Sequence, residues 1–292
     1  IGYLHRAYEK LGEDRTYHQY ITYTDRLDYT APFSNNVAYA MAVEKLLGIE
    51  IPPRNQYIRV ICCEIARISA HLLSLGTYAV DLGAATIFFY TFQQREILYD
   101  LQEKLTGARM HTSYTRIGSL YRDLPPSWLK ELEDALPGIE KVLDDSERLL
   151  SKNPIWVKRT DGIGVIDKTT AYEYGITGPI LRAAGVPFDL RKAKPYLAYA
   201  DFDFDIPVGT NGDAYDRYMV RIMEIRESIK ILRQAIHRIP DGPIAADAPE
   251  VILPPKEKVY RSMEELIYHF KIIGNGFVVP PGDVYESIEA PK

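Results

Sequence analysis

An amphipathic stretch that begins at Pro53 constrains the fold of this chain more than any other feature. Its apolar residues recur at steps of three and four, which places them on one face of a helix. They are Tyr57, Ile61, Ile65, Ile68, Leu72 and Leu75. Because such a helix is stable only when that face is buried against other elements, the pattern predicts a helical core.

Further helix signals follow along the chain. We expect helices from Asn35 or Asn36 to Gly48, from Thr86 to about Leu105, from Pro125-Pro126 to about Asn153, from Asp213 to about His237, and from the Ser262-x-x-Glu265 capping box onward. The third should break at Pro137-Gly138. Residues 199–205 alternate like an exposed strand, and the rest of 154–212 is typical of loops and short strands. The predicted fold class is mainly α (α+β), as a single domain over 1–292.

Composition and charge exclude several classes of protein. The chain has 292 residues and a net charge of −5, and no basic run that would indicate nucleic-acid binding. Its two cysteines, Cys62 and Cys63, are adjacent, so a disulfide framework is excluded and buried free thiols are expected. No C-x-x-C or H-E-x-x-H motif indicates a metal site.

Neither a signal peptide nor a membrane span is expected. Residues 68–92 are the most apolar stretch, but they divide better into two helices that meet at Asp81-Leu82-Gly83. The chain starts at Ile1 without an initiator methionine, and we interpret this start as the interior of a longer chain.

Four groups of residues are candidates for chemistry. Asp81 is the only carboxylate between Glu64 and Glu96, so it is expected to find a partner or to stay protonated, although it could simply cap a helix end. The segment 23–29 combines two phenols, two carboxylates and a guanidinium, although these charges could form only a local ion pair. The pair His5-Arg6 and His111 complete the set, and a lone histidine is more often structural than catalytic.

Many short motifs in this chain resemble the D-type subunit of the respiratory NADH:quinone oxidoreductases (complex I), the subunit of the quinone site. The matching segments are residues 2–6, Asp25-Arg26-Leu27-Asp28-Tyr29, residues 42–47, Pro52-Pro53-Arg54, Asp81-Leu82-Gly83-Ala84, Gly107-Ala108-Arg109-Met110-His111, Asp189-Leu190-Arg191-Lys192, residues 204–209 and Tyr268-His269-Phe270-Lys271. The resemblance implies a fold like the nickel–iron hydrogenase large subunit. The two C-x-x-C metal-binding pairs of those hydrogenases are missing, which argues against hydrogenase activity.

The resemblance also implies roles for individual residues. Tyr29 matches the tyrosine that hydrogen-bonds the quinone, and Asp81 matches the aspartate that pairs with a quinone-binding histidine. Arg6 and His111 match residues beside the terminal iron–sulfur cluster. That 4Fe-4S cluster would be held by the neighbouring B-type subunit, whereas NADH and FMN would bind elsewhere in the complex. Quinone is then the substrate, and no cofactor would be bound by this chain alone.

The implied setting is a proton-pumping complex at the cytoplasmic side of a bacterial membrane, or at the matrix side in mitochondria. The B-type and C-type subunits and the membrane-arm subunit at the channel entrance would be partners. The family's N-terminal strand region and C-terminal segment are missing from 1–292, so the isolated chain should be inactive. Alternatives are a docking scaffold and a related complex that is fed by ferredoxin or a deazaflavin.

Overall fold

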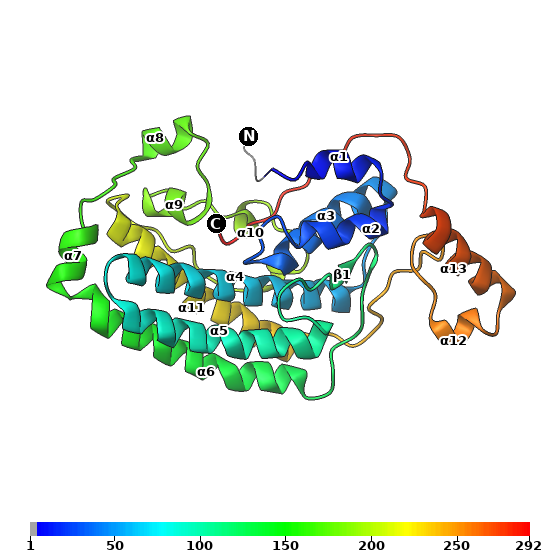
Figure 1. Ribbon diagram of the computed structural model, residues 1–292, viewed down its shortest axis with the longest axis horizontal. Helices are drawn as coiled ribbons and strands as arrows, with labels where there is room; N and C mark the ends of the chain where they lie inside the picture. The colour runs from blue at the N-terminus through cyan, green and yellow to red at the C-terminus, as the bar shows by residue number, and fades with distance from the viewer. Residues whose placement is uncertain (1–4) are drawn as a thin grey trace.

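The computed structural model describes residues 5–292, so Gly2, Tyr3 and Leu4 of the first motif lie outside it. The fold is mainly helical, as predicted (Figure 1). The helices are α1 (Tyr8–Glu13), α2 (Tyr17–Thr24), α3 (Pro32–Leu47), α4 (Pro53–Asp81), α5 (Ala85–Thr106), α6 (Trp128–Ser146), α7 (Pro154–Thr160), α8 (Lys168–Glu173), α9 (Gly178–Ala183), α10 (Leu190–Ala193), α11 (Ala214–Arg238), α12 (Lys256–Val259) and α13 (Met263–Asn275). A π-helical turn η1 (Glu147–Ser151), a 3₁₀ turn η2 (Tyr199–Asp201) and an antiparallel pair of short strands, β1 (Thr115–Arg116) and β2 (Ser119–Leu120), complete the described elements.

The long helices α4, α5, α6 and α11 lie side by side and share the main hydrophobic core (Figure 1). With 29 residues, α4 extends over about 43 Å. It ends at Asp81 and α5 starts at Ala85, so the predicted division of the apolar stretch into two helices is confirmed. The two helices approach closely at Gly76, where a Cβ atom would lie 2.4 Å from Thr91 Oγ1.

Two predicted helix ends are confirmed, and one predicted helix start is wrong. Helices α3 and α5 stop before Gly48 and Gly107, and Asp213 caps α11 by accepting a hydrogen bond from the Asp216 amide. Helix α3, however, begins at Pro32 rather than at Asn35 or Asn36. Proline suits a first helical position because its φ is already helical and its missing N–H would have no helical partner there.

The predicted break at Pro137-Gly138 is wrong, because α6 continues through both residues. Pro137 faces solvent, where the helix can bend away from the ring. Gly138 faces α5, and a Cβ atom there would lie 2.8 Å from Gln94 Oε1. Burial of apolar residues on both sides of the proline, such as Leu136 and Ile139, outweighs the lost hydrogen bond.

The predicted strand over 199–205 is also wrong, although the alternation behind it is real. Phe202 and Phe204 are buried, whereas the acidic residues between and after them are exposed. The backbone is paired with side chains of α11 instead of a strand. The Asp203 amide donates to Gln234 Oε1 over 2.9 Å, and Gln234 Nε2 donates back to the Asp203 carbonyl over 2.7 Å.

Helices α12 and α13 form a projection at one end of the molecule (Figure 1, orange). Only Ile272 of α13 is buried. Within residues 5–292, every helix is too short or too polar to cross a membrane.

Candidate functional site

The residues between α2 and α3 form a turn that gathers three of the four predicted site residues. We call residues 25–30 the Tyr29 turn. Asp25 is fully buried, and its carboxylate accepts hydrogen bonds from the Ser113 amide over 3.1 Å and from Ser113 Oγ over 2.5 Å. These bonds fix the segment that carries His111 against the turn. Arg6 is also attached to the turn, since its guanidinium donates a hydrogen bond to the Arg26 carbonyl over 2.8 Å.

Asp28 organises the tip of the Tyr29 turn. Its Oδ1 atom accepts hydrogen bonds from the Thr30 amide over 3.2 Å and from Thr30 Oγ1 over 2.7 Å. Its carbonyl accepts a further bond of 2.9 Å from Asn35 Nδ2. The next residue, Tyr29, is 57% exposed. The turn therefore presents a phenol to its surroundings from a well-bonded backbone.

His111 lies in an irregular segment that is tied to α2 and α3. Its Nδ1 atom is buried and has no hydrogen-bond partner among the described residues. Two residues later, Ser113 has a φ of 42°, a left-handed conformation that is uncommon for a residue other than glycine. Its bonds to Asp25 stabilise that conformation. A left-handed residue and an unpaired imidazole nitrogen two positions apart are features that cluster at functional sites.

No hydrogen bond or ion pair within residues 5–292 joins Asp81 to the Tyr29 turn, although the resemblance assigns both to the quinone site. Asp81 is the last residue of α4 and it is exposed, so its carboxylate can remain solvated without a partner. Its carboxylate makes no hydrogen bond or ion pair with any other residue in the range 5–292. The helix dipole disfavours a carboxylate at this end. Asp81 borders an apolar groove of about 360 Å³ that also contains the exposed ring of Phe89.

A buried ionic cluster, which the sequence analysis missed, lies between α4, α9, α10 and α11. It consists of Glu64, Arg67, His71, Arg182, Asp189, Arg191, Glu224 and Glu289, all of them buried. Arg191 contacts Glu64 over 3.1 Å and Asp189 over 2.6 Å. Arg182 contacts Glu224 over 2.5 Å and Glu289 over 2.8 Å. The three- and four-residue spacing of Glu64, Arg67 and His71 was the local signal for this second buried face of α4.

The surroundings of the cluster determine its protonation. Burial alone would raise the pKa of Glu64, but the Arg191 and Arg67 guanidiniums outweigh it and hold the pKa below its usual value. Burial lowers the pKa of His71, and its hydrogen bond to Glu224 over 2.7 Å does not fully compensate. Arg182 already neutralises Glu224, so we take His71 as neutral at pH 7.

Residues 285–292 form no helix or strand and contact α3, α4 and the Tyr29 turn; we call them the C-terminal strap. Near its start, Glu286 pairs with Lys45 over 2.9 Å. In its middle, the Arg67 guanidinium donates to the carbonyls of Glu289 and Ala290 over 2.6 and 3.2 Å. At its end, Lys292 Nζ lies 2.9 Å from Asp28 Oδ1. The strap thus links the buried ionic cluster to the Tyr29 turn.

Comparisons with known proteins identify the relatives of this chain. The family described as "Respiratory-chain NADH dehydrogenase, 49 Kd subunit" matches residues 81–292. The D-type NADH-quinone oxidoreductase subunit of Methylacidiphilum infernorum is 57% identical over 292 residues, which are the whole of this chain and 70% of that protein. The chain belongs to this family. The resemblance noted from its motifs and the hydrogenase-large-subunit-like fold are thereby confirmed.

Further relatives in this family have similar coverage. The D-type NADH-quinone oxidoreductase subunit of Geotalea uraniireducens is 52% identical over all of this chain and 75% of its own length. A D-type subunit of Opitutus terrae is 52% identical over 297 aligned residues, with all of this chain and 69% of that protein covered. As a member of the family, the chain is a component of an oxidoreductase complex.

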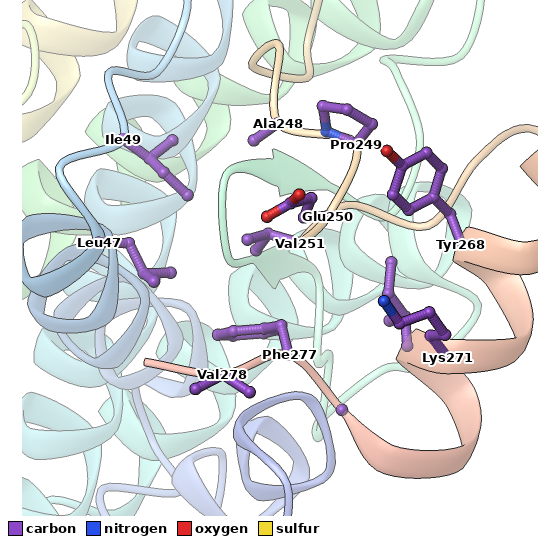
Figure 2. Close-up of a pocket in the computed structure, with 12 residues that line it drawn as sticks. Leu47, Ile49, Ala248, Pro249, Glu250, Val251, Tyr268, Lys271, Phe277 and Val278 are labelled. Atoms are coloured by element: carbon purple, nitrogen blue, oxygen red, sulfur yellow. The ribbon is translucent and has the colours of Figure 1, made fainter. Parts of the chain in front are cut away.

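A second groove of this family member, of about 580 Å³, lies between the end of α3, residues 248–251 and α13 (Figure 2). Leu47, Ile49, Val251 and Phe277 form its apolar walls, and Lys271 stands at the α13 side. None of the four predicted site residues lines it. The groove is therefore separate from the Tyr29 turn.

The two cysteine thiols are buried, and the described residues contain no grouping of possible metal ligands. Cys62 and Cys63 are both buried and unpaired, as predicted. Burial raises the pKa of Cys63 to about 12, which suits a structural thiol. Within the described part of the chain, no three His, Cys, Asp or Glu side chains are grouped so as to hold a metal ion.

Proposed function

We propose that this chain forms part of the quinone-reduction site of an NADH-quinone oxidoreductase and donates hydrogen bonds and protons to the quinone. The observation that carries the proposal is the Tyr29 turn. It holds an exposed phenol on a bonded backbone, with Arg6 and His111 tethered to the same turn. Family membership supports the substrate, because the curated relatives are named NADH-quinone oxidoreductases.

Quinone reduction requires proton donors at the site. Reduction of a quinone to a quinol consumes two electrons and two protons. A phenol has a pKa of about 10, so it becomes a useful donor only when the accepting oxygen turns strongly basic, as it does on reduction. Tyr29 is proposed to donate its hydroxyl proton to a quinone oxygen and to be reprotonated afterwards.

Arg6 and His111 would face the source of electrons. An iron–sulfur cluster held by the B-type subunit supplies single electrons when it is present. The positive charge of Arg6 favours the reduced state of a nearby redox centre. The Nδ1 atom of His111 has no hydrogen-bond partner among the described residues, and we propose that it exchanges a proton with its surroundings when an electron arrives.

Asp81 is proposed to act at the far end of the site. Its carboxylate is unpaired within residues 5–292 and borders an apolar groove suited to a lipid-soluble substrate. The resemblance pairs this aspartate with a quinone-binding histidine of the family. The B-type and C-type subunits, the membrane-arm subunit, proton pumping and a location at the cytoplasmic face of the membrane belong to the same proposal.

The test is Tyr29→Phe in the assembled complex. We expect NADH:quinone activity to fall about 100-fold, the usual scale for loss of a proton donor, while the subunit composition stays normal. Tyr174→Phe is the matched control, since its phenol is 79% exposed and far from the turn in sequence. Normal quinone turnover in Tyr29→Phe would refute the assigned role.

Asp81→Lys separates catalysis from a scaffold role. Loss of quinone reduction with normal assembly favours chemistry at this carboxylate. Loss of assembly, with the remaining complex fully active, would instead favour a docking function for the end of α4.

A further inference from the structure

The C-terminal strap is held by two buried guanidiniums of the ionic cluster. Arg67 and Arg182 are fully buried, and both contact the strap. Arg182 also receives the Glu289 carboxylate, whose second oxygen accepts a bond of 3.0 Å from the Leu190 amide. Breaking such contacts would leave buried charges uncompensated, so the middle of the strap is fixed relative to α4 and α9.

The end of the strap is fixed by close packing against α9. Gly178, the first residue of α9, has a φ of 67°, which favours glycine. A Cβ atom at this position would lie 3.0 Å from the Lys292 carbonyl carbon. The backbone of Lys292 therefore passes α9 at a distance that only a glycine accepts without displacement.

From this fixed backbone the Lys292 side chain reaches the Tyr29 turn. Its ammonium lies 2.9 Å from Asp28 Oδ1 and 5.9 Å from the centre of the Tyr29 ring. The Tyr29 hydroxyl itself has no hydrogen-bond partner in the part of the chain that the structure describes. The ammonium is thus a contact that fixes both the tip of the turn and the face of the phenol ring.

We propose that Lys292 is a positioning residue for Tyr29. The strap runs from the buried ionic cluster to the Tyr29 turn and places the Lys292 ammonium there. This charge orients the phenol through its contacts with Asp28 and with the face of the ring. This inference rests on the proposed function of Tyr29. Because the ion pair is partly exposed, it contributes little to folding stability, and its effect is expected in substrate binding.

The experiment compares three variants in the assembled complex. Lys292→Met keeps the apolar stem and removes the charge, whereas Lys292→Arg keeps the charge. Lys45→Met is the matched control, because Lys45 also pairs with the strap, but at Glu286. We expect the quinone KM to rise about five- to tenfold in Lys292→Met with kcat within about twofold, and both other variants to remain near the parent.

A double-mutant cycle with Asp28→Asn tests the route of the effect. If Lys292 acts mainly through Asp28, the double variant Asp28→Asn/Lys292→Met should raise KM little more than either single variant. Fully additive effects would overturn that route. An unchanged KM in Lys292→Met, or an equal rise in Lys45→Met, would overturn the positioning role itself.

The outcome is distinguishable from failure of the proposed function. If Tyr29→Phe abolishes quinone reduction while Lys292→Met leaves KM unchanged, only the positioning role fails. If Tyr29→Phe is fully active, the function of the turn fails. Reduction of ferricyanide by NADH, which bypasses the quinone, should stay normal in every variant and confirms that the electron input is intact.

Discussion

Replacing Glu64 by glutamine tests the energetic weight of the buried ionic cluster. The carboxylate of Glu64 contacts Arg191 over 3.1 Å and Arg67 over 3.3 Å, and it accepts a bond of 2.6 Å from the Tyr199 hydroxyl. Glutamine preserves the volume and one acceptor oxygen, so packing changes little. The change removes one negative charge from between two buried guanidiniums.

The expected loss of folding stability depends on the contacts that Arg191 and Arg67 keep in the variant. Breaking a buried pair typically costs about 3–5 kcal/mol. Arg191 keeps Asp189 and Arg67 keeps two backbone carbonyls, so the low end applies, about 3 kcal/mol. With a urea m-value of about 3 kcal/mol/M, the midpoint of unfolding should fall by about 1 M. Circular dichroism of the purified protein during urea titration measures that shift.

The matched control is Glu140→Gln. Glu140 makes two bonds to Arg233, of 2.9 and 2.7 Å, but the pair is partly exposed. Such pairs are worth about 0–1 kcal/mol, so its midpoint should move by less than about 0.3 M. Equal shifts in the two variants, or an unchanged midpoint in Glu64→Gln, would refute the view that burial makes the cluster essential for stability.

Helix packing and the protonation of His71 lead to two further expected outcomes. Gly76→Ala places a methyl group against Thr91 Oγ1 and should destabilise the protein by about 1–3 kcal/mol in the same urea assay, whereas an unchanged midpoint would show that α4 and α5 separate easily. His71 has a lowered pKa in the folded protein, so its contribution is present above about pH 6.5 and is lost as the pH falls. His71→Gln should therefore flatten the decline in stability as the pH falls below about 6.5, by up to about 1.4 kcal/mol per pH unit, and an unaltered slope would contradict a neutral His71.

Local signals predicted the helical framework well. The spacing of apolar residues and the capping residues predicted helix α4, its end at the Asp81 corner and the start of α11 at Asp213. They failed where tertiary contacts decide. Pro137 is tolerated because α6 is held by burial on both sides, and residues 202–205 find hydrogen-bond partners on α11 that no local pattern reveals.

The candidate site was less accessible to sequence reasoning. Motifs indicated Arg6, Tyr29 and His111, and the structure brings them to one turn through Asp25 and its bonds to Ser113. That contact joins residues 88 positions apart, so spacing alone could not predict it. The charged residues of the ionic cluster lie on segments far apart in sequence. From the sequence alone, each of them is as compatible with an exposed helix face as with a buried one.

The C-terminal strap also bears on the order in which the protein can be made. Arg67 leaves the ribosome long before Glu289, which completes the cluster 222 residues later. At about 5–20 residues per second, the interval is roughly 10–45 s. During that time the nascent helices carry guanidiniums whose final neighbours do not yet exist, so the native interior can close only after the last segment of 1–292 has been synthesised.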